Sequence, residues 1–176
     1  MVGTGHRKSR LREAEFPVGL YTAEQRRRRD ETVWTLVQGI LAPLQFLVFL
    51  VSLGLIARTM ATGEGLAAAQ YSVIAKTLVL YAIMVTGAIW EKVVFGKYLF
   101  ADAFFWEDVF SMAVIALHTA CLWAYWADTL SASAQLTLAL TAYAAYLVNA
   151  GQFLWKLRMA RLQAADLGGP AMGGAR

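Results

Sequence analysis

Residues 89–118 read IWEKVVFGKYLFADAFFWEDVFSMAVIALH, and this stretch joins two long apolar segments through a short loop rich in aromatic residues. Carboxylates lie on both sides of the loop, with Glu91 before it and Glu107 and Asp108 after it. A lone histidine, His118, follows about three helical turns later. A short connection makes two helices antiparallel neighbours, so we expect these carboxylates to converge at one end of a helical bundle.

The apolar residues of the chain come in long blocks, which indicates membrane spans. Of the 176 residues, 59% are hydrophobic, and the mean hydropathy is +0.49. About 20 consecutive apolar residues suffice to cross a bilayer. The predicted fold is all-α, an integral membrane four-helix bundle with spans near residues 35–57, 69–90, 107–126 and 134–155. The bundle occupies residues 33–158, between a basic N-terminal tail (1–32) and a flexible C-terminal tail (159–176).

The basic residues predict the orientation of the bundle. Eight of the sixteen Lys and Arg residues precede Val33, and six more lie in the central loop and beyond the fourth span. Four spans put all fourteen on one face, so the positive-inside rule predicts a cytoplasmic location for both termini and the central loop. The run Arg26–Arg29 is compatible with a nucleic-acid arm, but basic segments beside a first span more commonly lie on lipid. We therefore expect contact with the bilayer and no nucleic acid. The run Thr22–Gln25 is compatible with a capped short helix.

The third predicted span carries a polar stripe. Glu107, Ser111 and His118 are spaced by four and then seven residues, so they share one helix face. A carboxylic acid in a water-poor site can hold its proton to near-neutral pH and donate it in a reaction. His118 has three interpretations: a metal ligand, an acid–base group or a hydrogen-bonded core residue. Carboxylates at a helix start can also be structural, and this alternative is strongest for Asp108.

The other polar residues of the predicted spans also have two interpretations each. Gln38 and Gln45 are seven residues apart on one face of the first span, where they either contact a substrate or join helices. Lys76 either extends to the membrane surface, the outcome we expect, or lies buried beside a carboxylate. The aromatic residues Trp90, Phe104, Phe105 and Trp106 form either an interfacial belt or a slot for a large flat ligand.

Several kinds of chemistry have no motif in this sequence. It contains no Walker loop, no glycine-rich dinucleotide motif, no HExxH and no CxxC. Its single cysteine, Cys121, lies in an apolar block and is most simply a core residue. The sequence thus predicts neither a nucleotide or flavin cofactor nor a protein-bound metal.

Four runs carry a resemblance to a known family: YTAEQRRRRD (21–30), WTLVQGILAPLQFLVFLVSL (34–53), VLYAIMVTGAIWEKVVFGKYLF (79–100) and AFFWEDVFSMAVIALHTA (103–120). Over about residues 20–160 the chain resembles the vinyl bacteriochlorophyllide hydratases of bacteriochlorophyll synthesis. The resemblance implies a hydro-lyase, a carbon–oxygen lyase in the bacterial inner (photosynthetic) membrane. It would add water to the C3-vinyl group of chlorophyllide a or bacteriochlorophyllide and give the 3-(1-hydroxyethyl) product. Hydration needs no redox cofactor, and the magnesium ion involved would belong to the pigment substrate. We also expect contacts with other enzymes of the pathway.

Under this resemblance, Glu91 and Glu107 are expected to divide proton donation and water activation, with Asp108 in reserve. His118 is expected to be an axial ligand of the chlorin magnesium or a proton shuttle. The expected substrate contacts are Lys92 and Lys97 with the pigment propionate, together with Trp90, Phe104, Phe105, Trp106, Gln38 and Gln45. The main alternative is a non-enzymatic pigment carrier or assembly factor that uses the same aromatic slot. A small transporter or an anchor for a redox complex is a second alternative.

Overall fold

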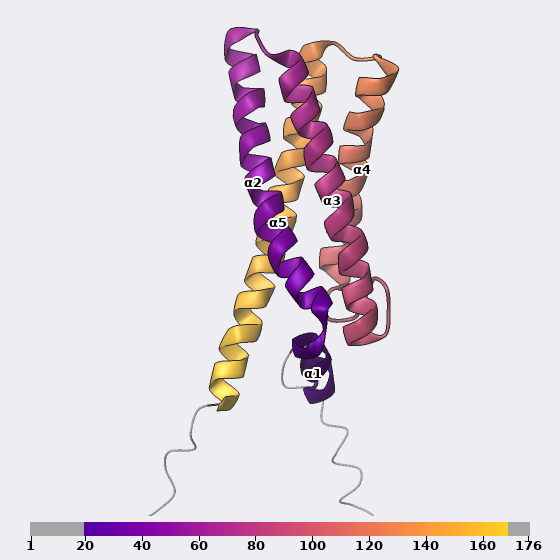
Figure 1. Cartoon of the computed structure of the whole chain (residues 1–176), viewed down its shortest axis with the longest axis vertical. Helices are drawn as coiled ribbons and strands as arrows, with labels where there is room; N and C mark the ends of the chain where they lie inside the picture. Colours follow the sequence, from indigo (N-terminus) through magenta and orange to yellow (C-terminus); the bar gives the residue numbers. More distant parts are fainter. Residues whose placement is uncertain (1–19, 169–176) are drawn as a thin grey trace, which may run out of the picture.

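The computed structural model of this protein describes residues 20–168, and within them all regular structure is helical (Figure 1). The five helices are α1 (Ala23–Glu31), α2 (Val33–Thr62), α3 (Leu66–Phe95), α4 (Phe105–Ala127) and α5 (Ala132–Gly168). This confirms the predicted all-α fold class. The predictions for residues 1–19 and 169–176 fall outside the described part of the chain.

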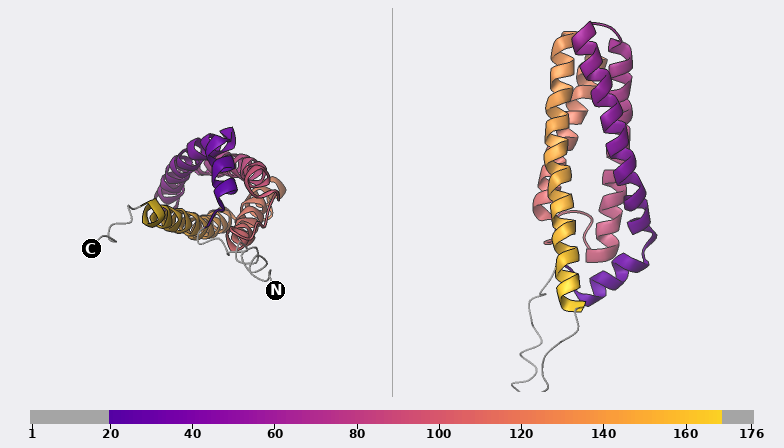
Figure 2. Two further views of the ribbon diagram at one scale, coloured as in Figure 1. Left: turned by 90° about the horizontal axis from the view of Figure 1, so that it is seen from below. Right: turned by 90° about the vertical axis from the view of Figure 1, so that its left-hand side faces the viewer.

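The four long helices run alongside one another and are arranged around a common axis (Figure 2). Helix α2 packs mainly against α3, and α4 packs mainly against α5. The short helix α1 contacts the end of α3 from which the central loop leaves, and the described chain begins and ends at this same end (Figure 1). The central loop, α1 and the last turns of α5 therefore lie at the same end of the bundle.

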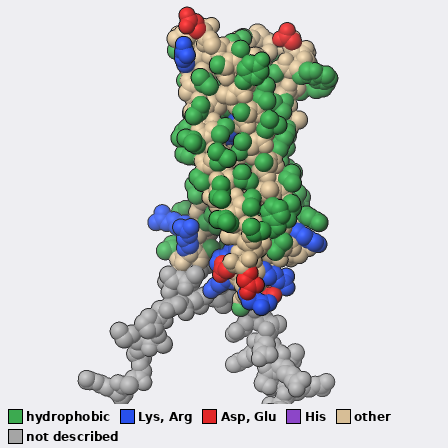
Figure 3. All heavy atoms as spheres, viewed as in Figure 1, with side chains coloured by type: hydrophobic (Ala, Val, Ile, Leu, Met, Phe, Trp, Pro, Cys, Tyr) green, Lys and Arg blue, Asp and Glu red, His purple; other side chains and the backbone are tan. Residues whose placement is uncertain are grey.

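Three of the helices are long and apolar enough to cross a membrane. They are α2, α3 and α4, which contain the first three predicted spans. The fourth predicted span lies in α5, which is longer and more polar and continues to Gly168. Apolar side chains are spread along the visible face between its two ends. Charged side chains gather at the two ends, most of them at the α1 end (Figure 3). This distribution is that of a membrane protein.

The predicted helix cap at Thr22 is confirmed. Its hydroxyl accepts a hydrogen bond from the Gln25 amide at 3.2 Å, and the Gln25 side chain accepts one from the Thr22 amide at 2.9 Å. The reciprocal pair satisfies two backbone donors that a helix start leaves free. At the other side of the loop region, α3 ends at Gly96, whose φ of 84° is readily adopted only by glycine. This turn directs the chain into the loop that carries the candidate site.

The buried apolar side chains form two groups. The larger fills the space between α2, α3, α4 and α5 along most of their length. The smaller lies at the α1 end and contains Tyr21, Val94 and Phe104. Because the segment just before α1, helix α3, the loop and α5 all contribute residues to this second group, it fixes the central loop against the helices.

Candidate active site

A pair of buried carboxyl groups lies where the central loop meets α3 and α4. Glu91, one turn before the end of α3, is 6% exposed, and Asp108, in the first turn of α4, is 2% exposed. The two carboxyl groups are close enough to interact directly. Buried carboxyl groups are rare in proteins unless they have partners or a function. This pair is therefore the strongest candidate for acid–base chemistry in the described structure.

Two successive backbone amides of the loop point at this pair. The Phe100 amide donates to Oδ2 of Asp108 at 2.7 Å, and the Ala101 amide donates to Oε2 of Glu91 at 3.4 Å. Phe100 has a φ of 58°, the left-handed conformation that non-glycine residues seldom adopt. Successive amides in such a turn form a small concave site for anions. The loop backbone thus takes a strained conformation in which it binds the carboxyl pair.

Glu107 has a different environment from its neighbour Asp108. Its Oε2 atom lies 2.6 Å from Nζ of Lys156 on α5, and both side chains are largely buried. The Lys156 ammonium group also lies 5.0 Å from the centre of the Phe104 ring. The structure therefore brings Glu91 together with Asp108 and pairs Glu107 with a cation. The expected division of roles between Glu91 and Glu107 stays a prediction, and the geometry favours Asp108 as the partner of Glu91.

Aromatic rings surround this region on the side of α1. Phe104 is 3% exposed and lies at the centre of the group. Its ring centre is 5.8 to 6.5 Å from those of Tyr21, Trp90, Phe95 and Phe153. Burial raises the pKa of the Tyr21 phenol above its ordinary value, so this side chain is neutral at physiological pH. In contrast, Phe105 and Trp106 are 43% and 67% exposed, and their rings contact Phe100 and each other.

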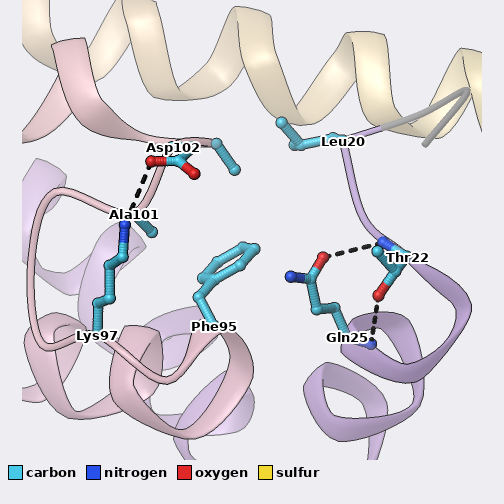
Figure 4. Close-up of a pocket in the computed structure, with 8 residues that line it drawn as sticks. Leu20, Thr22, Gln25, Phe95, Lys97, Ala101 and Asp102 are labelled. Atoms are coloured by element: carbon cyan, nitrogen blue, oxygen red, sulfur yellow. Dashed lines mark hydrogen bonds and ion pairs between the residues drawn. The ribbon is translucent and has the colours of Figure 1, made fainter. Parts of the chain in front are cut away.

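An open cleft of about 340 Å³ lies between the central loop and the segment that leads into α1 (Figure 4). It is lined by Leu20, Thr22, Gln25, Phe95, Lys97, Ala101, Asp102 and Ala103. Ala101 belongs to both places, because it lines the cleft and its amide binds Glu91. One stretch of loop backbone therefore separates the cleft from the carboxyl groups. The volume of the cleft lies at the lower end of the range for small-molecule sites.

The two lysines of the loop region already have partners. Nζ of Lys92 donates to the carbonyl of Gly96 at 2.9 Å, and Nζ of Lys97 lies 3.3 Å from Asp102. Asp102 is almost fully exposed, so the second contact is a weak surface ion pair. Lys97 borders the cleft, whereas Lys92 does not line it. Of the two predicted propionate contacts, Lys97 is thus the one that lies at the cleft.

His118 and Lys76 lie in the main core of the bundle, away from the loop. Ten residues of α4 separate His118 from Asp108, a rise of about 15 Å. Nδ1 of His118 is hydrogen-bonded to the Val114 carbonyl at 2.8 Å, and its Nε2 has no partner among the described residues. Lys76 is fully buried, with its ammonium group 3.8 Å from the centre of the Tyr146 ring. The prediction that Lys76 extends to the surface is therefore wrong, because a cation–π contact holds it inside.

The two glutamines of α2 lie in different surroundings. Gln38 joins α2 to α3 by donating to the Thr86 hydroxyl at 2.7 Å and to the Ile83 carbonyl at 3.4 Å. This contact favours the helix-joining interpretation for Gln38. Gln45 is buried, and its Oε1 atom has no partner among the described residues.

Sequence reasoning missed two contacts that α5 makes with α4. Lys156 is one of the basic residues counted above beyond the fourth span, and it forms an ion pair with Glu107. Asn149 donates to the Ser111 hydroxyl at 2.9 Å and continues the polar stripe. No local pattern indicates either contact, because the partners are 49 and 38 residues apart. Among the described residues, no cluster of three or more His, Cys, Asp or Glu side chains could hold a metal ion.

Comparison with known proteins identifies the family of this chain. The model of the 2-vinyl bacteriochlorophyllide hydratase (BCHF) family matches residues 21–159. A relative from Cereibacter sphaeroides named 2-vinyl bacteriochlorophyllide hydratase is 71% identical over 143 residues, which cover 81% of this chain and 89% of the relative. A second relative of the same name, from Rhodobacter capsulatus, is 68% identical over 147 residues, which cover 84% of this chain and 85% of that relative. No solved structure matches the chain significantly. The matched region includes both carboxyl groups, the loop and Lys156, and the chain belongs to the 2-vinyl bacteriochlorophyllide hydratase family.

Proposed function

We propose that this protein is a membrane hydro-lyase that adds water to the C3-vinyl group of a chlorin pigment in bacteriochlorophyll synthesis. The substrate is chlorophyllide a or the corresponding bacteriochlorophyllide, and the product carries a 3-(1-hydroxyethyl) group. Membership of the family supports the reaction. The observation that carries the proposed site is the buried pair of Glu91 and Asp108 beside the cleft.

Addition of water to a vinyl group needs one acid and one base. The acid gives a proton to the terminal vinyl carbon, which becomes a methyl group. The positive charge left on the inner carbon is delocalised into the macrocycle, and the oxygen of a water molecule attacks that carbon. The base takes the surplus proton from this water, so one water molecule is consumed and the pair holds the same number of protons as before. Glu91 and Asp108 supply the two carboxyl groups, and Glu107 stays paired with Lys156.

The cleft and its surroundings give a route for the pigment to this pair. The loop backbone at Ala101 must move aside for the vinyl group to meet the carboxyl groups, since its amide binds Glu91. The rings around Phe104 then provide an apolar wall for the macrocycle. Lys97 borders the cleft and pairs with the pigment propionate in exchange for Asp102, with Lys92 as a second cation nearby. Trp90 is partly buried and belongs to these rings, whereas Phe105 and Trp106 are exposed.

His118 has a separate place in this proposal. Its unpartnered Nε2 atom is a ring nitrogen suited to bind the magnesium of the pigment or to carry a proton. About 15 Å of helix rise separates it from Asp108, more than the distance from the magnesium of a chlorin to its vinyl carbons, so a pigment bound to His118 would occupy a different position from one that reacts at the carboxyl pair. Gln45 faces the same interior with a free acceptor, whereas Gln38 serves to join helices.

We further propose that all four long helices cross the membrane as a bundle, with both termini in the cytoplasm of a photosynthetic bacterium. The polar residues of α5 support this proposal, because Asn149 faces the bundle and Lys156 binds Glu107 rather than lipid. The concentration of basic residues at the α1 end supports the cytoplasmic side for that end. Accessibility of single introduced cysteines to a membrane-impermeant thiol reagent, in Cys121→Ala protein, would test this orientation.

The test of function is an assay of membranes from cells that express this chain alone, supplied with chlorophyllide a or its bacteriochlorophyllide counterpart. We expect a product heavier by one water, with blue-shifted absorption because the vinyl group leaves conjugation. Glu91→Gln and Asp108→Asn should each lower the rate by at least about 100-fold. Glu64→Gln is the matched control, because this exposed carboxylate lies at the opposite end and pairs only loosely with Arg58.

The outcomes separate an enzyme from a pigment carrier. Pigment bound by the unaltered protein but returned unchanged, with both substrates, would contradict the hydratase proposal and favour the carrier. Full activity in both carboxyl variants would leave the reaction in place but contradict the proposed site.

A further inference from the structure

We propose that the two carboxyl groups have fixed and different roles: Glu91 gives its proton to the terminal vinyl carbon, and Asp108 takes the proton from the attacking water. This inference rests on the proposed function and deepens it. In a symmetric carboxyl pair, either group could be the proton donor and the other the proton acceptor. Two features of the surroundings make this pair asymmetric: the hydrogen bonds from the loop and the positions in the two helices.

The first feature is the unequal pair of hydrogen bonds from the loop. The Phe100 amide is 2.7 Å from Asp108, whereas the Ala101 amide is 3.4 Å from Glu91. Hydrogen bonds to an ionised acceptor are shorter and stronger than those to a neutral one. The short bond therefore selects Asp108 as the carboxylate, and the long bond leaves Glu91 as the neutral acid.

The second feature is the position of each carboxyl group along its helix. Asp108 lies in the first turn of α4, where free amides and the helix dipole favour a negative charge. Glu91 lies near the C-terminal end of α3, where the dipole disfavours one. Both helix ends meet at the loop, so the two dipoles act in the same sense and favour a charge on Asp108.

The charged groups that face the pair do not change this asymmetry. Glu107 and Lys156 both interact with Asp108 at longer range. Because these two form an ion pair at 2.6 Å, their effects largely cancel. Two adjacent buried carboxyl groups avoid holding two negative charges, so they share one proton. The two features assign that proton to Glu91 in the resting enzyme.

The division of roles has a distinct consequence for each direction of the reaction. In hydration, the proton of Glu91 becomes a methyl proton, water adds to the inner carbon, and Asp108 receives the proton that this water loses. In dehydration, Asp108 returns that proton to the departing hydroxyl group, which leaves as water. The Glu91 carboxylate then removes a methyl proton and restores the vinyl group. Each variant that lacks one of the two carboxyl groups should therefore retain a different half of the chemistry.

Isotope exchange measures the two partial reactions, protonation of the vinyl carbon and addition of water, separately. In heavy water, Asp108→Asn protein still has its acid, so Glu91 can add a deuteron to the vinyl carbon and remove a proton again. We expect deuterium in the terminal vinyl position with little net hydration. In ¹⁸O-labelled water, Glu91→Gln protein incubated with the hydroxyethyl pigment still has Asp108. We expect ¹⁸O in the hydroxyl group with little return to the vinyl pigment.

The pattern of exchange decides the assignment. Deuterium exchange in Asp108→Asn and oxygen exchange in Glu91→Gln, each at least tenfold above the double variant, would support it. The reverse pattern would overturn it and make Asp108 the acid. Absence of both exchanges in variants that still bind pigment would also overturn it, because the two proton transfers would then not be separable. Full hydration by both variants contradicts the proposed site, and no hydration by unaltered protein contradicts the proposed reaction.

A second pair of variants guards against misfolding. Asparagine and glutamine keep an oxygen that can accept the loop amides, so both single variants should fold. Glu91→Asp and Asp108→Glu keep each carboxyl group while changing its reach, and both should retain both exchange reactions at reduced rates. The pigment absorption of each purified variant in detergent checks that binding is preserved.

Discussion

The Nζ atom of Lys156 lies 2.6 Å from Oε2 of Glu107, and this ion pair ties α5 to the first turn of α4 beside the candidate site. The two residues are 49 positions apart in the chain. The contact gives Glu107 a cation as its partner, whereas Asp108, the next residue, meets Glu91. It also gives α5, the most polar of the long helices, a specific place in the bundle.

Breaking this ion pair from one side should destabilise the protein. A largely buried charge without its partner costs about 3 kcal/mol or more, so Lys156→Met or Glu107→Gln should each lower the midpoint of thermal unfolding in detergent. The double variant leaves no unpaired charge, so its midpoint of thermal unfolding should fall by clearly less than the sum of the two decreases in the single variants. Strict additivity of the three values would contradict a direct interaction.

The strained backbone of Phe100 predicts an unusual ranking of substitutions. Its φ of 58° is costly for any residue with a Cβ atom but not for glycine. Phe100→Ala and Phe100→Gly both remove the ring, and they differ in that backbone penalty. We expect the glycine variant to be the more stable by about 1 kcal/mol, measured by thermal unfolding in detergent. The opposite ranking would indicate that the loop relaxes in solution.

The contact between Gln38 and Thr86 should couple α2 to α3. The 2.7 Å hydrogen bond between their side chains lies in the part of the bundle near the loop. Gln38→Leu and Thr86→Val each remove one partner, and the coupling in a double-mutant cycle should be about 0.6 to 1 kcal/mol. Gly87→Ala is a suitable control, because an added Cβ would meet the Gln38 side chain at 3.8 Å, an ordinary contact. A coupling near zero would show that the bond contributes nothing.

The role of His118 can be read from the bound pigment. His118→Phe fills a similar volume but removes the free Nε2 atom, whose lack of a partner motivates the proposal. As an axial ligand of magnesium, His118 should influence the absorption of the bound pigment, so we expect a shifted spectrum and about tenfold weaker binding. His118→Gln, which keeps a polar ligand atom, should be affected less. An unchanged spectrum with normal affinity would exclude ligation and leave His118 as a core residue stacked on Tyr143.

The helices and the region of the site could be predicted from the sequence because both depend on local patterns. Apolar blocks of sufficient length indicated α2, α3 and α4 as spans, and the capping run at Thr22 indicated α1. A short loop between two long helices brought Glu91 to the start of α4. Helices α2, α3 and α4 extend a few residues beyond the predicted spans, whereas α5 continues well beyond the fourth, to Gly168.

The sequence by itself determined the helical class, the family and the convergence of carboxyl groups beside the central loop. Only the tertiary structure decided that Glu91 meets Asp108, that Lys156 neutralises Glu107 and that Lys76 is buried. Successive residues on a helix point about 100° apart, so the rotation of α4 between α3 and α5 sends Glu107 and Asp108 to different partners. That rotation is set by packing between helices distant in the chain, and no local pattern encodes it.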